Sequence, residues 1–241
     1  TIDLVGEITS VPYINMTCSL LGRAGIKATF EGQSIRVFSQ ENVEVKTLVV
    51  ESDWSSASYH FSMAALAAKT TISINNYVAD SLQGDSVLIS IYNQMGVAST
   101  FDGNTLHLTK TNDVKSHIEL NLIKAPDIAQ TIAVSCFGLG ISCDLYGLHT
   151  LKIKETDRLV ALENELGKLG ASIRVTDDAL HLEARQTPIR QNVAIDTYHD
   201  HRMAMAFSTL GSTFGNLSID DKNVVNKTYP SFWDDYAQLS T

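Results

Sequence analysis

The sequence predicts an α/β fold built from a repeated β-α-β-α-β-β unit of roughly seventy residues. The first observation behind this prediction is a spacing: Gly25, Gly96 and Gly170 each follow a helical pattern and lie 71 and 74 residues apart. The second is that each glycine precedes two short alternating runs with a turn between them. The third is a nearly uncharged helical pattern that recurs between these blocks.

The helices before the three glycines share one apolar face. Stepping back one and four residues from each glycine finds an apolar side chain every time, which places the apolar stripe on the same side of each helix. A glycine directly after such a stripe is typical of a helix C-cap. The residue pairs are Ala24 and Leu21, Met95 and Tyr92, and Leu169 and Leu166.

A hairpin is predicted after each glycine. The paired runs alternate between apolar and polar residues, and acidic residues or glycine stand at the turns. The predicted strands are 26–30 with 35–38, 97–101 with 106–108, and 173–175 with 180–182. The turns are Glu31-Gly32, Asp102-Gly103 and Asp177-Asp178.

A second helix family is rich in Ala, Ser, Met and Gly and carries little charge beyond its first turn. Such composition is typical of helices buried on most sides. These helices are predicted at 55–68, 127–139 and 200–214, and each leads into a short strand, at 71–74, 142–145 and 217–219. Residues 1–5 read as an opening strand, and a fourth unit is expected to begin at Val225-Asn226-Lys227.

Composition limits the classes of partner. The chain has 241 residues, is 44% hydrophobic and carries a formal net charge of -9, which argues against nucleic acid or an anionic membrane as a general partner. No apolar run is long enough to span a bilayer. Cys18, Cys136 and Cys143 lie in apolar stretches without metal-site spacing, so we expect buried, reduced thiols and a cytoplasmic location.

Two charged clusters precede apolar helical patterns, Lys154-Glu155-Thr156-Asp157-Arg158 and Asp200-His201-Arg202. Free backbone N–H groups and the positive end of the helix dipole favour an anion at such a place. The two arginines can each grip a carboxylate or phosphate, and Glu155 can carry a proton. His201 is expected to orient a neighbour.

Each of these features also has a purely structural interpretation. Asp127, directly after Pro126, is a common helix-start acid. Thr156 can serve as an N-cap surrounded by surface ion pairs. Lys227 can be a solvated loop lysine, and Ser55-Ser56-Ala57-Ser58 is a good N-cap run in any protein.

Seven segments, in order along the chain, together resemble the enolpyruvyl transferases, most closely the 5-enolpyruvylshikimate-3-phosphate synthase (3-phosphoshikimate 1-carboxyvinyltransferase) family. They are Ser10-Val11-Pro12-Tyr13, Ser55-Ser56-Ala57-Ser58-Tyr59, Leu82-Gln83-Gly84-Asp85, Pro126-Asp127, Lys154-Glu155-Thr156-Asp157-Arg158-Leu159, Asp200-His201-Arg202-Met203-Ala204-Met205 and Lys227-Thr228-Tyr229-Pro230. A single segment is a weak signal, whereas seven in the family's order are specific.

The resemblance implies a two-lobed inside-out α/β fold whose helix N-termini face a cleft between the lobes. It also implies a reaction in which the enolpyruvyl group of phosphoenolpyruvate passes to the 5-hydroxyl of shikimate 3-phosphate, with release of phosphate. In the family this proceeds by addition and elimination, without a metal or an organic cofactor.

The resemblance also assigns roles to nine residues. Asp127 would take the proton from the attacking hydroxyl, and Glu155 and Lys227 would handle the second proton. Arg158, Arg202 and Lys227 would hold phosphoenolpyruvate. Shikimate 3-phosphate would be held by Ser10, Tyr13, Asp127, Thr150 and Lys154. Thr150 stands where the family usually has Asn.

The same resemblance divides the chain. Residues 1–50 match the last part of the family's first lobe and residues 51–241 its second lobe, and the family's N-terminal motifs are absent. We therefore expect a C-terminal fragment that is inactive alone, because one wall of a two-walled site is missing. Its expected partners are the two substrates, the N-terminal segment of the same protein, and further copies bound through the incomplete lobe.

Two other functions remain open from the sequence. One is the related transferase that acts on UDP-N-acetylglucosamine, which the two charged clusters argue against. The other is a repeat-built scaffold without chemistry, since folds made of repeated α/β units also form clamps around nucleic acid. The acidic balance argues against the clamp.

Overall fold

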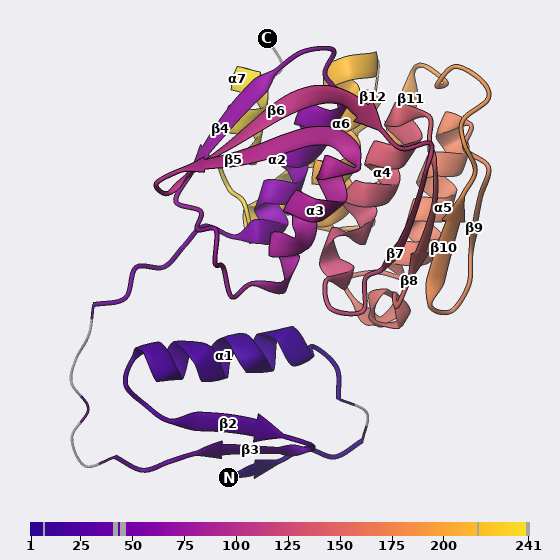
Figure 1. The fold of residues 1–241 in the computed structure, drawn as a ribbon. Helices are drawn as coiled ribbons and strands as arrows, with labels where there is room; N and C mark the ends of the chain where they lie inside the picture. The colour runs from indigo at the N-terminus through magenta and orange to yellow at the C-terminus, as the bar shows by residue number, and fades with distance from the viewer. Residues whose placement is uncertain (7, 41–42, 44–46, 216, 240–241) are drawn as a thin grey trace.

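Three buried helices form the centre of the molecule, and sheets flank them (Figure 1). The structure is a computed structural model that describes residues 1–6, 8–40, 43, 47–215 and 217–239. The central helices are α2 (Trp54–Leu66), α4 (Ala129–Leu139) and α6 (His201–Phe214), and each packs against the other two. The three predicted low-charge helices are confirmed, because only such surfaces can be buried on several sides.

Hydroxyl groups link the central helices across their interface. Ser135 Oγ donates to Ser62 Oγ at 2.7 Å, and Ser62 Oγ donates to Thr209 Oγ1 at 2.8 Å. Ser58 and Thr131 share a further contact of 3.0 Å. These groups are buried, and since they bond to one another they do not incur the cost of an unpaired polar atom.

One four-stranded sheet has the order β7-β8-β10-β9. Its strands β7 and β8 run parallel and are joined through α4, whereas β10 runs antiparallel to both neighbours. The helix α5 (Arg158–Leu169) connects β8 to β9 and ends at Gly170, whose φ is 100°. The strands are β7 (His117–Asn121), β8 (Ser142–Tyr146), β9 (Ile173–Val175) and β10 (Ala179–Leu182).

A second sheet has the order β4-β6-β5, with α3 between β4 and β5. Its succession of strand, helix and hairpin repeats that of β8, α5, β9 and β10. A second copy of the parallel step is β11-α6-β12. The predicted unit is therefore complete once, from β7 to β10, and is present in part in α2 to β6 and in β11 to β12 among the described residues. These elements are β4 (Thr71–Asn75), α3 (Leu88–Asn93), β5 (Met95–Asp102), β6 (Thr105–Val114), β11 (Val193–Ile195) and β12 (Leu217–Ile219).

The N-terminal residues form a small separate layer. Its sheet has the order β1-β3-β2, and α1 packs on β2. In Figure 1 its backbone lies apart from the other elements, and no residue of α1 is buried, but Pro12 and Tyr13 of α1 line a cavity together with Gly84 and Asp127. The elements are β1 (Ile2–Asp3), α1 (Val11–Arg23), β2 (Ala28–Glu31) and β3 (Ser34–Val37).

Two predictions about the repeat are wrong. Gly96 does not cap a helix: α3 is capped by Gln94, and Gly96 lies inside β5 at a bulge, where a Cβ would lie 2.8 Å from the Thr111 carbonyl oxygen. No fourth unit begins at Val225. The segment forms a 3-10 helix (Lys222–Lys227) followed by α7 (Phe232–Leu239), which buries Phe232.

Local capping also differs from the sequence interpretation. Asp53, not a serine, caps α2 by accepting from the N–H groups of Ser55 and Ser56. Asp157, not Thr156, caps α5. In both cases a nearby carboxylate is the N-cap, where its negative charge faces the positive end of the helix dipole.

The three cysteines are free thiols. Cys136 and Cys143 are buried as predicted, but Cys18 is only partly buried because its helix α1 has no second layer against it. None of the helices in the described ranges is long and apolar enough to cross a membrane.

Gly147 follows β8 with a φ of 76°, and a Cβ there would lie 2.7 Å from the backbone nitrogen of Ile123. We therefore expect Gly147→Ala to lower the free energy of unfolding by at least about 2 kcal/mol, since left-handed backbone and a backbone clash combine. Urea unfolding measures this. The control is Gly167→Ala, inside α5 with open space around it. It should be neutral or raise stability by up to about 1 kcal/mol. Equal effects of both changes would contradict the assignment.

Candidate active site

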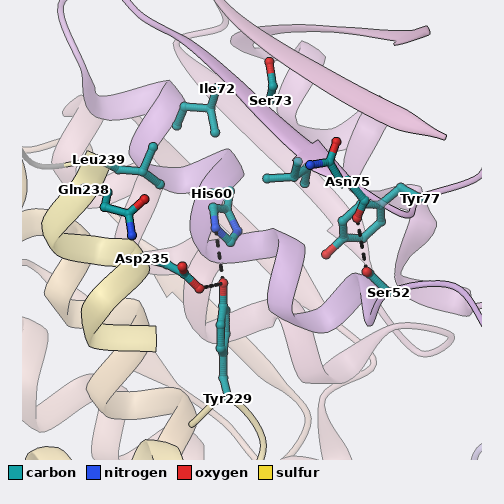
Figure 2. Close-up of a pocket in the computed structure, with 11 residues that line it drawn as sticks. Ser52, His60, Ile72, Ser73, Asn75, Tyr77, Tyr229, Asp235, Gln238 and Leu239 are labelled. Carbon is teal, nitrogen blue, oxygen red and sulfur yellow. Dashed lines mark hydrogen bonds between the residues drawn. The ribbon is translucent and has the colours of Figure 1, made fainter. Parts of the chain in front are cut away.

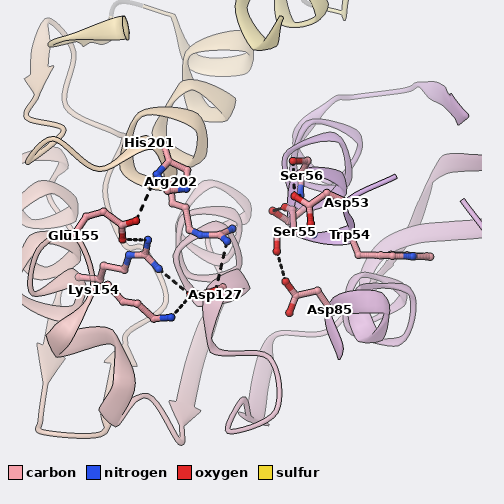
Figure 3. Close-up of polar contacts among 12 residues, drawn as sticks. Asp53, Trp54, Ser55, Ser56, Asp85, Asp127, Lys154, Glu155, His201 and Arg202 are labelled. Atoms are coloured by element: carbon pink, nitrogen blue, oxygen red, sulfur yellow. Dashed lines mark hydrogen bonds and ion pairs between the residues drawn. The ribbon is translucent and has the colours of Figure 1, made fainter. Parts of the chain in front are cut away.

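The N-terminal ends of the three central helices meet at one cluster of charged side chains (Figure 3). Arg202 is the second residue of α6. Its Nη2 lies 3.5 Å from Oδ2 of Asp127, which belongs to the 3-10 helix (Pro126–Ile128) that leads into α4. Asp53 and Asp85, at the start of α2 and beside it, act on Arg202 electrostatically.

Arg158 is the centre of this cluster and is only 1% exposed. Its Nη1 donates to Asp127 at 2.9 Å, and its Nη2 donates to Glu155 at 2.6 Å. Its Nε donates to Asp200 at 2.6 Å. Since the three carboxylates come from three different segments, the guanidinium fixes the relative position of those segments. A buried guanidinium is tolerable only when carboxylates pair with it in this way.

Two lysines complete the cluster. Lys154 Nζ lies 3.3 Å from Asp127 Oδ1, and Lys227 Nζ donates to Oε1 of Glu155. Together with the two arginines they provide four cations against the carboxylates of Asp127, Glu155 and Asp200. Such a group of cations at helix N-termini suits an anionic ligand.

The cations keep two carboxylates ionised. Burial by itself would raise the pKa of Asp127, but Arg202, Lys154 and Arg158 outweigh it and lower that pKa below its ordinary value. Burial likewise opposes ionisation of Glu155, yet the hydrogen bond from Lys227 and the charge of Arg158 bring its pKa to about 2. At neutral pH both carboxylates are therefore ionised, Asp127 among its cations and Glu155 beside Lys227.

Asp85 behaves in the opposite way. It lies in the 3-10 helix Gly84–Val87 and accepts a hydrogen bond from Ser55 Oγ at 2.5 Å. Burial raises its pKa to about 6, and the Ser55 hydrogen bond only partly offsets this. The sequence showed Asp85 only as part of a matching segment, since its burial depends on α2 folding over it.

The family resemblance assigned nine candidate site residues. The structure brings six of them into direct contact with one another. These six are Asp127, Lys154, Glu155, Arg158, Arg202 and Lys227. Tyr13 borders the cluster, because it lines a cavity of about 480 Å³ together with Asp127, Asp85 and Ser55. Burial and the charges of Asp85 and Asp127 raise the pKa of its hydroxyl.

Ser10 and Thr150 stand outside this contact network in the part of the chain that the structure describes. Ser10 is an exposed residue at the start of α1 with a φ of 57° and makes no side-chain cap. Thr150 belongs to the 3-10 helix His149–Ile153, which packs beside Pro126–Ile128. Its buried Oγ1 has no hydrogen-bond partner among the described residues.

Sequence reasoning missed the structural importance of Asp200. It is fully buried, it pairs with Arg158, and it accepts from the backbone N–H of Arg202 at 2.8 Å. The sequence signal was its place directly before a helix, which indicates an N-cap. The partner of Asp200, 42 residues away, is visible only in the folded chain.

His201, next to Asp200, is buried. Burial and the nearby charge of Arg202 lower the pKa of His201 to about 4, so its imidazole stays neutral at pH 7.

A second pocket of about 290 Å³ lies around His60, Tyr229 and Asp235 (Figure 2). Tyr229 donates to Asp235 at 2.8 Å, and no lysine or arginine of the described residues lines the pocket. It therefore lacks the charge that an anionic substrate needs. Within the described ranges, no set of three or more His, Cys, Asp or Glu side chains is arranged to hold a metal ion.

Comparison with known proteins identifies relatives along almost the whole chain. The family model described as EPSP synthase (3-phosphoshikimate 1-carboxyvinyltransferase) matches residues 1–236. A 3-phosphoshikimate 1-carboxyvinyltransferase of Bacteroides fragilis is 37% identical over 96% of this chain and 57% of its own length. One from Herminiimonas arsenicoxydans is 35% identical over 100% of this chain and 55% of its own. The chain thus spans just over half the length of these relatives.

Solved structures support the predicted inside-out α/β fold. An EPSP synthase from Acinetobacter baumannii matches with a TM-score of 0.72 at 21% identity, covering 98% of this chain and 56% of that one. The enolpyruvyl transferase NikO from Streptomyces tendae matches with a TM-score of 0.67 at 13% identity, covering 95% and 53%. At these identities the likeness concerns the fold alone.

The raised pKa of Asp85 makes its ionisation costly in the folded state. As pH rises from 3.8, the unfolded chain loses this proton first, so the free energy of unfolding falls until about pH 6. We expect Asp85→Asn to remove that fall and to raise stability at pH 7 by about 1 to 3 kcal/mol. Denaturant unfolding at pH 4 and pH 7 measures it. Asp53→Asn is the matched control at the same helix start and should change little, because Asn caps as well as Asp. A destabilised Asp85→Asn at pH 7 would refute the assignment.

Proposed function

The chain belongs to the EPSP synthase (3-phosphoshikimate 1-carboxyvinyltransferase) family, and we propose that it supplies one wall of that enzyme's active site. The proposed reaction transfers the enolpyruvyl group of phosphoenolpyruvate to the 5-hydroxyl of shikimate 3-phosphate and releases phosphate. The observation that carries the proposal is the ionised Asp127 carboxylate, held among Arg158, Arg202 and Lys154.

In this proposal Asp127 is the general base. Its lowered pKa keeps it ionised at neutral pH, and it lines the same cavity as Tyr13. As the 5-hydroxyl oxygen adds to C2 of phosphoenolpyruvate, its proton passes to Asp127. Such a base typically contributes a factor of about 10² to 10⁴ in rate.

Arg158, Arg202 and Lys227 would hold the carboxylate and phosphate of phosphoenolpyruvate. The guanidinium of Arg202 lies 3.5 Å from Asp127 and also hydrogen-bonds with Tyr59. It pairs with fewer carboxylates than Arg158 does in the described part of the chain, which leaves donors for a ligand. Arg202 stays charged, since its carboxylate neighbours and Tyr59 outweigh burial and raise its pKa. Lys154 would bind shikimate 3-phosphate beside Asp127, with Ser10, Tyr13 and Thr150 as further contacts.

Glu155 and Lys227 would handle the second proton together. Lys227 donates to Glu155 in the unliganded protein, so the pair holds one proton that can move toward C3 of phosphoenolpyruvate during addition. In elimination the C3 proton returns to the pair as the C–O bond to phosphate breaks. The cycle uses no external oxidant or reductant.

We further propose that residues 1–50 belong to the first lobe of the whole protein and residues 51–241 to the second. The curated relatives are longer than this chain. The part of them that this chain does not match would supply the other half of the site, opposite Asp127 and Arg202. The chain alone would then be inactive or nearly so, because the transition state would contact only one wall. Reduced thiols suit a cytoplasmic location for the whole protein.

The test joins this chain to the N-terminal segment of its own protein, or to that of the Bacteroides fragilis relative, and measures phosphate release from phosphoenolpyruvate and shikimate 3-phosphate. We expect activity from the joined protein. Asp127→Asn should lower kcat at least 100-fold by removing the base. The matched control is Asp113→Asn, an exposed residue of β6 outside the charged cluster, which should leave kcat within twofold.

Three results would count against the proposal. The first is no phosphate release from a folded joined protein. The second is full activity of Asp127→Asn. The third is protection from unfolding by UDP-N-acetylglucosamine but not by shikimate 3-phosphate, which would favour the other enolpyruvyl transferase. Salt-dependent DNA binding would instead support a scaffold role, which the net charge of -9 disfavours.

A further inference from the structure

The turn before α6 holds two consecutive residues in left-handed backbone conformation. Tyr198 has a φ of 53° and His199 a φ of 56°. For residues other than glycine this costs about 1 to 2 kcal/mol each, so surrounding contacts must hold the turn in place. Asp200 follows immediately, and its backbone N–H donates to the carbonyl oxygen of the buried Thr197 at 2.8 Å.

Glu165 provides those contacts. This carboxylate is 0% exposed although it belongs to none of the matching segments. It accepts a hydrogen bond from the Tyr198 hydroxyl at 2.8 Å and another from the backbone N–H of Asp196 at 3.1 Å. Lys168 Nζ donates to it at 2.6 Å and neutralises its charge. Asp196 in turn accepts from the Tyr198 backbone N–H at 2.9 Å.

The helix α5 therefore binds the turn at two points. Arg158 at its first position pairs with Asp200, and Glu165, two helical turns later, pairs with Asp196 and Tyr198. Residues seven apart lie on the same face of a helix. One face of α5 thus fixes both ends of the segment 196–200, and this segment sets where α6 and Arg202 begin.

We propose that Glu165 and Tyr198 are positioning residues for the arginines of the site. They hold the strained turn in place, so that the Asp200 carboxylate can accept from Arg158 and at the same time cap α6 at the N–H of Arg202. Without them the turn relaxes toward ordinary backbone conformations, Asp200 withdraws, and both guanidinium groups lose their fixed orientation. The positioning role of Glu165 and Tyr198 does not depend on the proposed function. Only its expected effect on catalysis rests on that function.

The first test is a spectroscopic measurement on the chain itself. The Nε–H group of Arg158 is buried against Asp200, so its ¹⁵N–¹H resonance should exchange slowly with solvent. Its absence from Arg158→Lys assigns it. We expect Tyr198→Phe, which removes only the hydroxyl, to speed this exchange at least tenfold. Glu165→Gln should do the same or more.

His199→Gly is the matched control in the same turn. The His199 side chain is 93% exposed and approaches only Asp221, at 3.8 Å, among the described residues. The change relieves left-handed strain without touching Glu165, so the Arg158 Nε–H exchange should stay within twofold. The proposal is overturned if Tyr198→Phe also stays within twofold, or if His199→Gly speeds exchange as much as Tyr198→Phe does.

The second test uses the protein joined to its N-terminal segment. We expect Tyr198→Phe to raise KM for phosphoenolpyruvate about tenfold, because the arginines that would hold this anion lose their orientation. KM for shikimate 3-phosphate should change less than twofold. Equal changes in both KM values would indicate a general structural role and overturn the proposal. If the joined parent protein transfers no enolpyruvyl group, the proposed function fails, and the exchange measurement still decides the role of the turn.

Discussion

The buried guanidinium of Arg158 is the constraint on which the site depends. A charge with 1% exposure is stable only if it is paired, and Asp127, Glu155 and Asp200 provide the acceptors. These carboxylates belong to the turn before α4, the segment before α5 and the start of α6. One side chain therefore fixes three segments, and the positions of the remaining cations follow from theirs.

The repeated unit explains why these segments meet. The β-α-β step directs α4 and α6 the same way, and α2 packs against both of them, so the N-terminal ends of the three helices meet in one place. Helix ends alone favour an anion only weakly. The specific chemistry comes from the side chains at those ends, where Asp127 stays ionised among cations while Asp85, further from them, has its pKa raised by burial to about 6.

The fold could be predicted from the sequence wherever the signal was local. Glycine spacing and alternation located the hairpins and the low-charge helices. The prediction that Gly96 caps a helix was wrong, because in a sequence a glycine required by a β-bulge looks the same as one that caps a helix. The site was predictable as far as its motifs reached. The contacts that the motifs did not reveal join residues far apart in the sequence. Asp200 pairs with Arg158 across 42 residues, and Asp85 pairs with Ser55 across 30 residues. Glu165 contacts Tyr198 across 33 residues. Such pairs arise only when tertiary structure forms, so no local pattern reveals them.

The central claim is that Arg158 and Asp200 stabilise the site as one interacting pair. A double-mutant cycle of Arg158→Met and Asp200→Asn, followed by urea unfolding at pH 7, tests it most directly. Each single change should cost about 3 to 5 kcal/mol, because it leaves a buried charge without its partner. The coupling energy should exceed about 1 kcal/mol. Additive effects, with coupling below about 0.5 kcal/mol, would contradict the account.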